Sequence, residues 1–244
     1  MKKVLFVSIV IMLISAMLIS IIFIFKDKKE ENEQEKIFEE ITEIAKEKTD
    51  NKESIQEDTV NIKELYKINN DIIGWIKIEN SNIDYPVMQT KENPNYYLKR
   101  NFYKQYSILG TPYMAENCNI EKSDNLIIYG HHINGNKLFG ELENYKSKKY
   151  YDTHKIIKFY TMTENAEYEI IAIFKTVAYT GFQYYKFYNA EDEREFNTFI
   201  EKCKELSFYD TKKTAVYGDK LITLSTCEYS NENGRLVIVA RKII

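Results

Sequence analysis

Two strand-like runs lie near the C-terminus, Leu221-Ile222-Thr223-Leu224-Ser225-Thr226-Cys227 and Arg235-Leu236-Val237-Ile238-Val239-Ala240. A short polar loop joins them, so a cysteine ends one predicted strand and an arginine begins the next. A third apolar run, Leu126-Ile127-Ile128-Tyr129, leads into Gly130-His131. Rigid strand ends fix the geometry of reactive groups and leave their side chains open to a ligand. Cys227, His131 and Arg235 are therefore the candidate site residues.

Further strands are predicted by period-two segments rich in β-branched and aromatic residues. These segments are Gly74–Ile78, Ile83–Met88, Ile156–Tyr160 and Tyr168–Tyr179. One helix interrupts them over Ala190–Leu206, with Phe196, Phe199, Ile200 and Cys203 on one face. Several short strands separated by turn signals predict a β-sandwich or a β-barrel.

Length and charge narrow the class of protein. A chain of 244 residues is long enough for one domain with appendages and a core of its own. Its 34 basic and 37 acidic residues leave a net charge of −3, and no basic stripe stands out. Phosphate recognition usually needs a concentrated basic face, so the sequence argues against a nucleic-acid partner.

Cysteine usage points to a free thiol. Three cysteines spread far apart leave at least one unpaired, although a disulfide between Cys118 and Cys203 stays open. The sequence has no CxxC or HExxH spacing, and a metal held by His131, His132 and Cys227 is the weaker alternative. We expect neither a metal nor another cofactor.

The N-terminus differs in composition from the rest. Val4–Phe25 is apolar, long enough to span a bilayer and flanked by lysines, and no small-x-small site closes it. It is expected to be an uncleaved transmembrane anchor over residues 1–26, whose orientation the even lysine balance does not decide.

A charged segment, residues 27–59, follows the anchor and precedes a domain over residues 60–244. Ile37, Phe38, Ile41, Ile44 and Ala45 recur at helical spacing from Lys26 to about Thr59. Such a stripe is usually packing, so a stalk or a cover on the domain is favoured over a partner-binding helix. A short helix is expected over Val60–Ile68.

The three candidate residues each have an alternative role. Cys227 precedes a polar loop that should face solvent, which suits a reactive thiol better than a buried hydrophobe. His131 can act as general acid and then general base, or simply hydrogen-bond a turn. His132 competes with it but should point to the opposite side of a strand. Arg235 can stabilise an oxyanion, or pair with a surface acid.

These residues resemble the sortases, the membrane-anchored cysteine transpeptidases of Gram-positive cell surfaces. The resemblance rests on Thr223-Leu224-Ser225-Thr226-Cys227 followed by Arg235, on Tyr129-Gly130-His131, and on the order His, Cys, Arg. It covers about Ile68 to Ile244. Class B fits best, given two helical segments before the strands, the late helix, Ser225-Thr226-Cys227-Glu228 and Tyr97-Leu98 before Asn101-Phe102-Tyr103.

The resemblance implies a mainly β fold: an eight-stranded sortase-type barrel with N-terminal helices and an inserted helix, preceded by a transmembrane helix. It places the catalytic domain outside the cell. It implies that Cys227 attacks the threonine carbonyl of a C-terminal sorting motif and forms a thioacyl enzyme, with His131 as proton carrier and Arg235 as substrate clamp. Residues expected to line the peptide groove are Leu98, Thr180, Tyr184, Ser225 and Glu228.

The implied partners are surface proteins that bear a C-terminal sorting signal, an amine acceptor on a peptidoglycan precursor or a pilin, and the cell membrane. Cell-wall anchoring and pilin polymerisation both stay open. A cysteine peptidase, in which water resolves the thioester, shares every candidate residue. A membrane-tethered binding protein with an incidental cysteine is the alternative outside enzymes.

Overall fold

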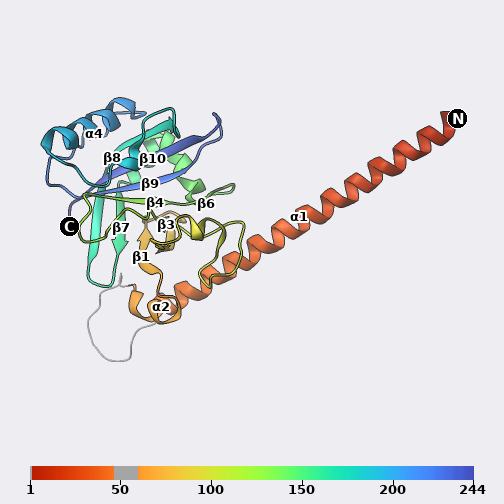
Figure 1. Cartoon of the computed structure of the whole chain (residues 1–244), viewed down its shortest axis with the longest axis horizontal. Coiled ribbons are helices and arrows are strands. Elements are labelled where there is room, and N and C mark those ends of the chain that lie inside the picture. The colour runs from red at the N-terminus through yellow and green to blue at the C-terminus, as the bar shows by residue number, and fades with distance from the viewer. Residues whose placement is uncertain (1, 47–59) are drawn as a thin grey trace.

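A closed β-barrel dominates the computed structural model, which describes residues 2–46 and 60–244 (Figure 1). Its strands run in the order β1-β2-β3-β4-β9-β10-β8-β7. Their bounds are β1 Ile72–Lys77, β2 Asp84–Met88, β3 Tyr113–Met114, β4 Asn125–Tyr129, β7 Ile156–Tyr160, β8 Asn165–Val177, β9 Leu221–Cys227 and β10 Gly234–Lys242. The eight-stranded, mainly β architecture expected from the resemblance is confirmed.

Shorter elements surround the barrel. A hairpin of β5 (His132–Ile133) and β6 (Lys137–Leu138) stands apart from it as a separate sheet. The helices are α1 Lys2–Lys46, α2 Ile62–Ile68, α3 Lys148–Thr153 and α4 Glu193–Leu206, with 3₁₀ turns η1 Tyr96–Lys99, η2 Phe139–Lys146 and η3 Tyr184–Lys186. The predicted late helix thus begins three residues later than expected.

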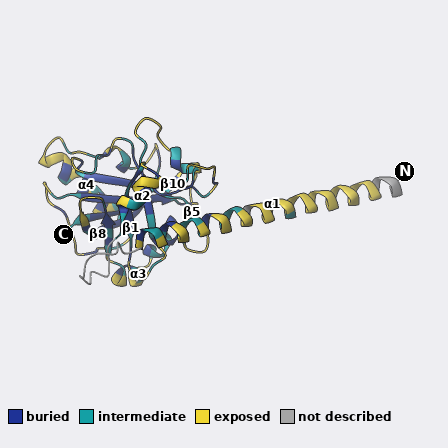
Figure 2. Cartoon of the chain, turned by 90° about the horizontal axis from the view of Figure 1, so that it is seen from below, coloured by how far each residue is buried: buried dark blue, intermediate teal, exposed yellow. Residues whose placement is uncertain are grey.

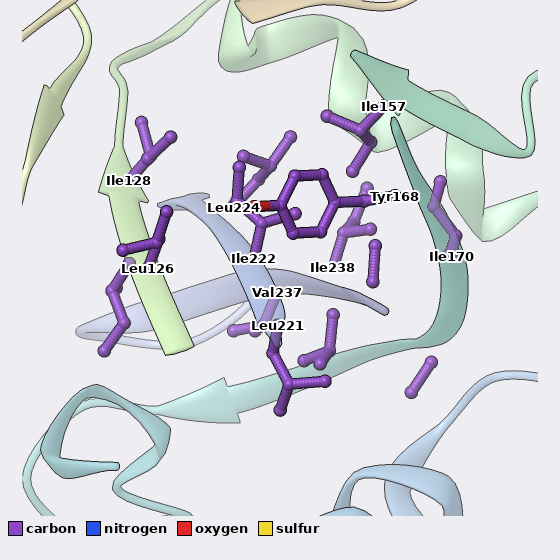
Figure 3. Packing of buried hydrophobic residues seen from close by; sticks show 14 of the residues in the cluster. Leu126, Ile128, Ile157, Tyr168, Ile170, Leu221, Ile222, Leu224, Val237 and Ile238 are labelled. Carbon is purple, nitrogen blue, oxygen red and sulfur yellow. The ribbon is translucent and has the colours of Figure 1, made fainter. Parts of the chain in front are cut away.

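The predicted strands are all present because their apolar runs fill the barrel. β9 pairs with β4 in parallel and with β10 in antiparallel orientation, and residues on both faces of β9 are buried. Continuous rather than alternating apolar sequence is what a strand covered on both faces requires. Ile222 and Leu224 of β9 meet residues of β4 and β10 in the core (Figure 3).

Helix α1 is one unbroken helix that changes character along its length. Phe6 to Phe25 present exposed apolar side chains, and this stretch is apolar and long enough to be the candidate membrane span of the described chain. Figure 2 shows α1 exposed over its distal part and increasingly buried where it meets the barrel. Residues 47–59 of the predicted charged helix lie outside the described residues.

The second half of α1 covers the barrel. Ile41 and Ala45 are fully buried in a cluster with Leu65 of α2 and Trp75 of β1. Lys46 Nζ reaches Asp84 Oδ2 of β2 at 3.2 Å. The predicted apolar stripe is therefore packing, and the cover role is confirmed for the described part of the segment.

The disulfide between Cys118 and Cys203, which the sequence left open, does not form. Cys203 lies on the buried face of α4 with Phe196, Phe199 and Ile200, as expected of a core residue. Cys118 lies in the core, donates to the carbonyl of Asn125 at 3.4 Å, and forms no disulfide. Cys203 faces the core from α4 and Cys118 lies in a loop beside β4, so the two thiols do not pair.

The packing of α1 predicts a large stability cost at Ile41. Replacing Ile41 by Ala should lower the free energy of unfolding by about 2–4 kcal/mol, because the site is fully buried and leaves a cavity. Glu43→Ala on the exposed face of the same helix is the matched control and should change it by less than about 0.5 kcal/mol. Thermal unfolding of the full chain in detergent micelles measures both, and equal effects would contradict the packed cover.

Candidate active site

Strand β9 brings the candidate residues together through its two neighbours. Tyr129 of β4 pairs with Ser225, and Gly130 N continues the ladder to Ser225 O at 3.1 Å. Thr226 Oγ1 donates to Gly130 O at 2.8 Å. His131 follows Gly130 directly, so the chain that carries it leaves β4 next to the end of β9 that carries Cys227.

Arg235 flanks Cys227 on the other side. The two residues are direct partners in the antiparallel β9–β10 ladder, so their side chains lie on the same face of the sheet. Adjacent strands lie about 4.8 Å apart, which leaves both side chains within reach of one ligand. The sequence prediction that these residues meet is supported by the backbone register alone.

Cys227 is the accessible thiol of the chain. It is half-buried, whereas Cys118 and Cys203 are buried. Burial raises the pKa of Cys118 to about 11 and raises the pKa of Cys203 well above its usual value. A thiol that stays protonated in the core is unreactive, so only Cys227 suits nucleophilic chemistry.

His131 is oriented by a backbone carbonyl. Its Nε2 lies 2.7 Å from Leu98 O, and because a carbonyl only accepts, Nε2 carries the hydrogen. Nδ1 is then the nitrogen left for proton exchange in the neutral ring. The predicted groove residue Leu98 thus contributes its backbone to the site by holding His131.

His132 also contacts the cysteine, contrary to the expectation that it points away. Its Nδ1 lies 3.0 Å from Cys227 O and therefore donates to it. The expectation treated both histidines as one strand, but β4 ends at Tyr129 and β5 begins at His132. The buried Oε1 of Glu143 lies 3.9 Å from the same ring nitrogen.

Arg235 keeps its charge available. Its Nη1 donates to Gly234 O at 2.8 Å, and within the described ranges no carboxylate forms an ion pair with it. The described residues thus give no support to the alternative of a surface arginine paired with an acid. An unpaired guanidinium beside a cysteine suits the binding of a carbonyl oxygen or an anion.

Ser225 and Tyr184 form a buried polar pair beside the cysteine. Ser225 lies two residues before Cys227 on the same face of β9, and its Oγ is 2.5 Å from the hydroxyl of Tyr184. Burial raises the pKa of Tyr184 to about 12. The charge of Arg235 lowers this pKa and the charge of Cys227 raises it. Tyr184, on η3, therefore lies next to Ser225, and its contact with a peptide stays a prediction.

Glu228 is occupied by the protein itself. Its buried carboxylate lies 2.5 Å from Lys175 Nζ and 3.0 Å from Lys146 Nζ, and it accepts a hydrogen bond from Ser230 Oγ. Although desolvation opposes it, hydrogen bonds from these groups lower the pKa of Glu228 to about 2. The carboxylate thus fixes the turn after Cys227.

Thr180 and the aromatic loop have different surroundings. Thr180 is exposed in the turn after β8, beside the loop after Cys227, since Ala178 N donates to Asn233 O at 2.9 Å. Phe182 and Phe187 pack on Phe199 of α4. They line a groove of about 510 Å³ that includes none of the candidate residues.

Two tyrosines near the site were missed by the sequence analysis. Burial raises the pKa of Tyr113, and the charge of Cys227 raises it further while that of Arg235 lowers it. Burial and the charge of Cys227 also raise the pKa of Tyr229, while the charge of Arg235 lowers it. The ring centroids of Tyr229 and His132 lie 5.0 Å apart in an edge-on arrangement. With 20 tyrosines in the chain, only the fold reveals which ones surround the thiol. No cluster of three metal-ligating side chains occurs in the described part of the chain.

Comparisons with known proteins agree with this geometry. A family model described as the sortase domain matches residues 76–243. Sortase B of Staphylococcus aureus is 32% identical over 182 residues, 73% of each chain, and sortase B of Listeria monocytogenes is 32% identical over 75% of this chain and 74% of its own.

Solved structures give the same result. A Staphylococcus aureus sortase B–substrate complex is 32% identical with a TM-score of 0.69, over 74% of this chain and 83% of that chain. Sortase B from Bacillus anthracis in complex with AAEK1 is 29% identical with a TM-score of 0.76, over 88% of this chain and 98% of that chain.

Glu228 predicts a pH-dependent contribution to stability. Because its folded pKa lies below the unfolded value of about 4.3, its stabilisation is fully present above that value and lost as pH falls toward about 2. Glu228→Gln should lower the free energy of unfolding at pH 7 by about 1–3 kcal/mol. Unfolding of both proteins from pH 7 to pH 2 should show this difference shrinking below pH 4.5, and a constant difference would contradict the assignment.

His132 predicts local order around the cysteine. His132→Phe keeps a ring beside Tyr229 but cannot donate to Cys227 O, so backbone amides of residues 227–234 should exchange hydrogen roughly threefold to tenfold faster. His154→Phe is the control, because His154 bonds to Tyr150 O and Asn80 O instead. Equal exchange in both variants would show that the His132 bond does not hold the loop.

Proposed function

Since the chain belongs to the sortase family and resembles sortase B over most of its length, we propose that this cysteine transpeptidase cleaves a C-terminal sorting motif after threonine. The cleaved protein is then transferred to an amine acceptor of the cell wall. The observations that support the proposal are the pairing of Cys227 with Arg235 across β9 and β10, and the hydrogen bonds that hold Gly130, the residue before His131, against the end of β9.

The first half of the reaction forms a thioester. The Cys227 thiolate attacks the threonine carbonyl carbon, and the carbonyl oxygen becomes an oxyanion. The bond to the next residue breaks as its nitrogen takes a proton from His131. The acyl group then stays on the sulfur, and the rest of the sorting signal leaves as a free amine.

The second half reverses the roles. An acceptor amine attacks the thioester carbonyl, His131 takes the amine proton, and the new amide forms as Cys227 leaves as a thiolate. The bond from Nε2 to Leu98 O suits this cycle, because it holds the ring in place while the other nitrogen exchanges the proton.

Arg235 stabilises charge in both tetrahedral intermediates. Its side chain lies on the same face of the sheet as Cys227, and no carboxylate among the described residues forms an ion pair with it. Nη1 is held by Gly234 O at 2.8 Å, and the other N–H groups of the guanidinium can donate to the developing oxyanion.

The groove residues take different parts. Leu98, Ser225 and Tyr184 surround the face on which Cys227 lies, and they are proposed to contact the peptide beside the threonine. Thr180 is proposed to contact it from the exposed turn. Glu228 shapes the groove by fixing the turn after Cys227.

The anchor sets the location. Sortases are membrane-associated cell-surface enzymes, and the apolar half of α1 is long enough to cross a bilayer. We infer a single-pass anchor over residues 1–26, a linker over 27–59 and an extracellular catalytic domain over 60–244. Its partners are then surface proteins with sorting signals and an amine on a peptidoglycan precursor or a pilin.

A peptide assay on the full chain in detergent micelles tests the function. Quenched fluorescent peptides with candidate sorting motifs are incubated with and without an amine acceptor. Cys227→Ala should lower turnover by at least about 10³-fold, and Arg235→Lys by roughly 10²-fold because a forked donor is lost. The amine should divert the product from acid to amide.

Two outcomes would contradict the proposal in different ways. Cleavage that depends on Cys227 but yields only acid in the presence of amine identifies a cysteine peptidase. Absence of Cys227-dependent cleavage with every peptide contradicts acyl transfer altogether, provided the variant and parent chains unfold at the same temperature.

A further inference from the structure

We propose that residues 31–46 of α1, here called the cover segment, position His131 for catalysis by fixing the two chain segments that contact it. This inference rests on the role of His131 in the proposed function. The two segments are the β5–β6 hairpin, which follows His131 directly, and the loop from Leu98 to Gly110. The cover segment contacts both.

The first contact is an ion-pair clamp on the hairpin. Lys137 of β6 reaches Glu31 Oε1 at 2.6 Å and Glu35 Oε1 at 2.5 Å. The two carboxylates stand one helical turn apart and face the same way. Their hydrogen bonds raise the pKa of Lys137. One lysine thereby ties the hairpin to α1.

The second contact passes through an aromatic pair. Phe38 of the cover segment packs edge-on against Tyr85, with ring centroids 5.0 Å apart. The Tyr85 hydroxyl accepts a hydrogen bond from Leu138 N at 3.2 Å. Leu138 has a φ of +48°, a conformation that a leucine keeps only when its surroundings hold it there.

The third contact supports the acceptor of His131. Gln34 is almost fully buried, and its Nε2 donates to Gly110 O at 3.2 Å. Gly110 has a φ of +62°, and a Cβ there would lie 2.5 Å from Leu98 O. The Gly110 backbone therefore lies beside the carbonyl that orients His131 Nε2, with no room for a side chain between them.

These contacts form one support because α1 is one rigid element. Ile41 and Ala45 bury the end of the cover segment in the domain, so Glu31, Gln34, Glu35 and Phe38 keep fixed positions. Pairing across the hairpin, His132 with Leu138 and Ile133 with Lys137, passes the restraint to the residue next to His131. In Figure 2 the β5 label stands near the part of α1 that meets the barrel.

The test removes the clamp in the full chain in detergent micelles. Lys137→Met keeps the length of the side chain and loses its charge. With a sorting peptide that the parent chain cleaves, we expect kcat to fall roughly twofold to fivefold and KM to stay unchanged. Amide hydrogen exchange over residues 132–138 should speed up by a similar factor. Reversing all three charges, with Lys137→Glu, Glu31→Lys and Glu35→Lys together, should restore both.

Lys213→Met is the matched control, because Lys213 pairs with Glu169 of β8 at 2.6 Å, and the sheet partner of Glu169 is Arg241, six residues after Arg235 on β10. It should change neither kcat nor exchange in the hairpin. Unchanged kcat and exchange in Lys137→Met would overturn the proposal, and so would a rise in KM alone, which indicates peptide contact. The exchange measurement needs no turnover. An inactive parent chain would therefore contradict the proposed function, while hydrogen exchange would still show whether Lys137 holds the hairpin.

Discussion

The register of β9 between a parallel and an antiparallel neighbour is the constraint on which the site depends. Side chains alternate along a strand, so a slip of one residue would turn Cys227 to the other face and away from Arg235. The apolar residues of β9 prevent that slip, because Ile222 and Leu224 are fully buried in the barrel core. Packing in the core thus fixes the position of Cys227 and Arg235 at the strand ends.

A second layer of polar contacts fixes the loop after the strand. Lys175 and Lys146 converge on Glu228, and His132 donates to the carbonyl of Cys227. These contacts hold the residues on either side of the thiol while the thiol itself stays half exposed. A rigid frame around an open nucleophile is what transfer to a second substrate requires, because the acceptor must reach the same carbon as the first.

The reach of sequence reasoning follows from the range of the interactions. Strands such as Leu221–Thr226 were predictable because burial on both faces leaves a continuous apolar run, and the order of His131, Cys227 and Arg235 pointed to the candidate site. β3, of two residues, carries no pattern and was missed. The carboxylate of Glu228, the ring of His132 and Tyr113 depend on partners tens of residues away, so no local pattern could assign them. The packing of α1 on the domain was predictable from the apolar stripe in its sequence, but its ion pairs with Lys137 were not.

The central claim is that Cys227 carries the acyl group between two substrates. The most direct measurement is intact-mass and peptide-mapping mass spectrometry of the full chain. The chain is mixed with a sorting peptide that it cleaves, in the absence of amine, and the reaction is quenched in acid. The account predicts a mass increase equal to the acyl fragment, located on Cys227 and removed by adding an amine acceptor. Turnover with an unmodified Cys227, or with the acyl group on Cys118 or Cys203, would contradict it.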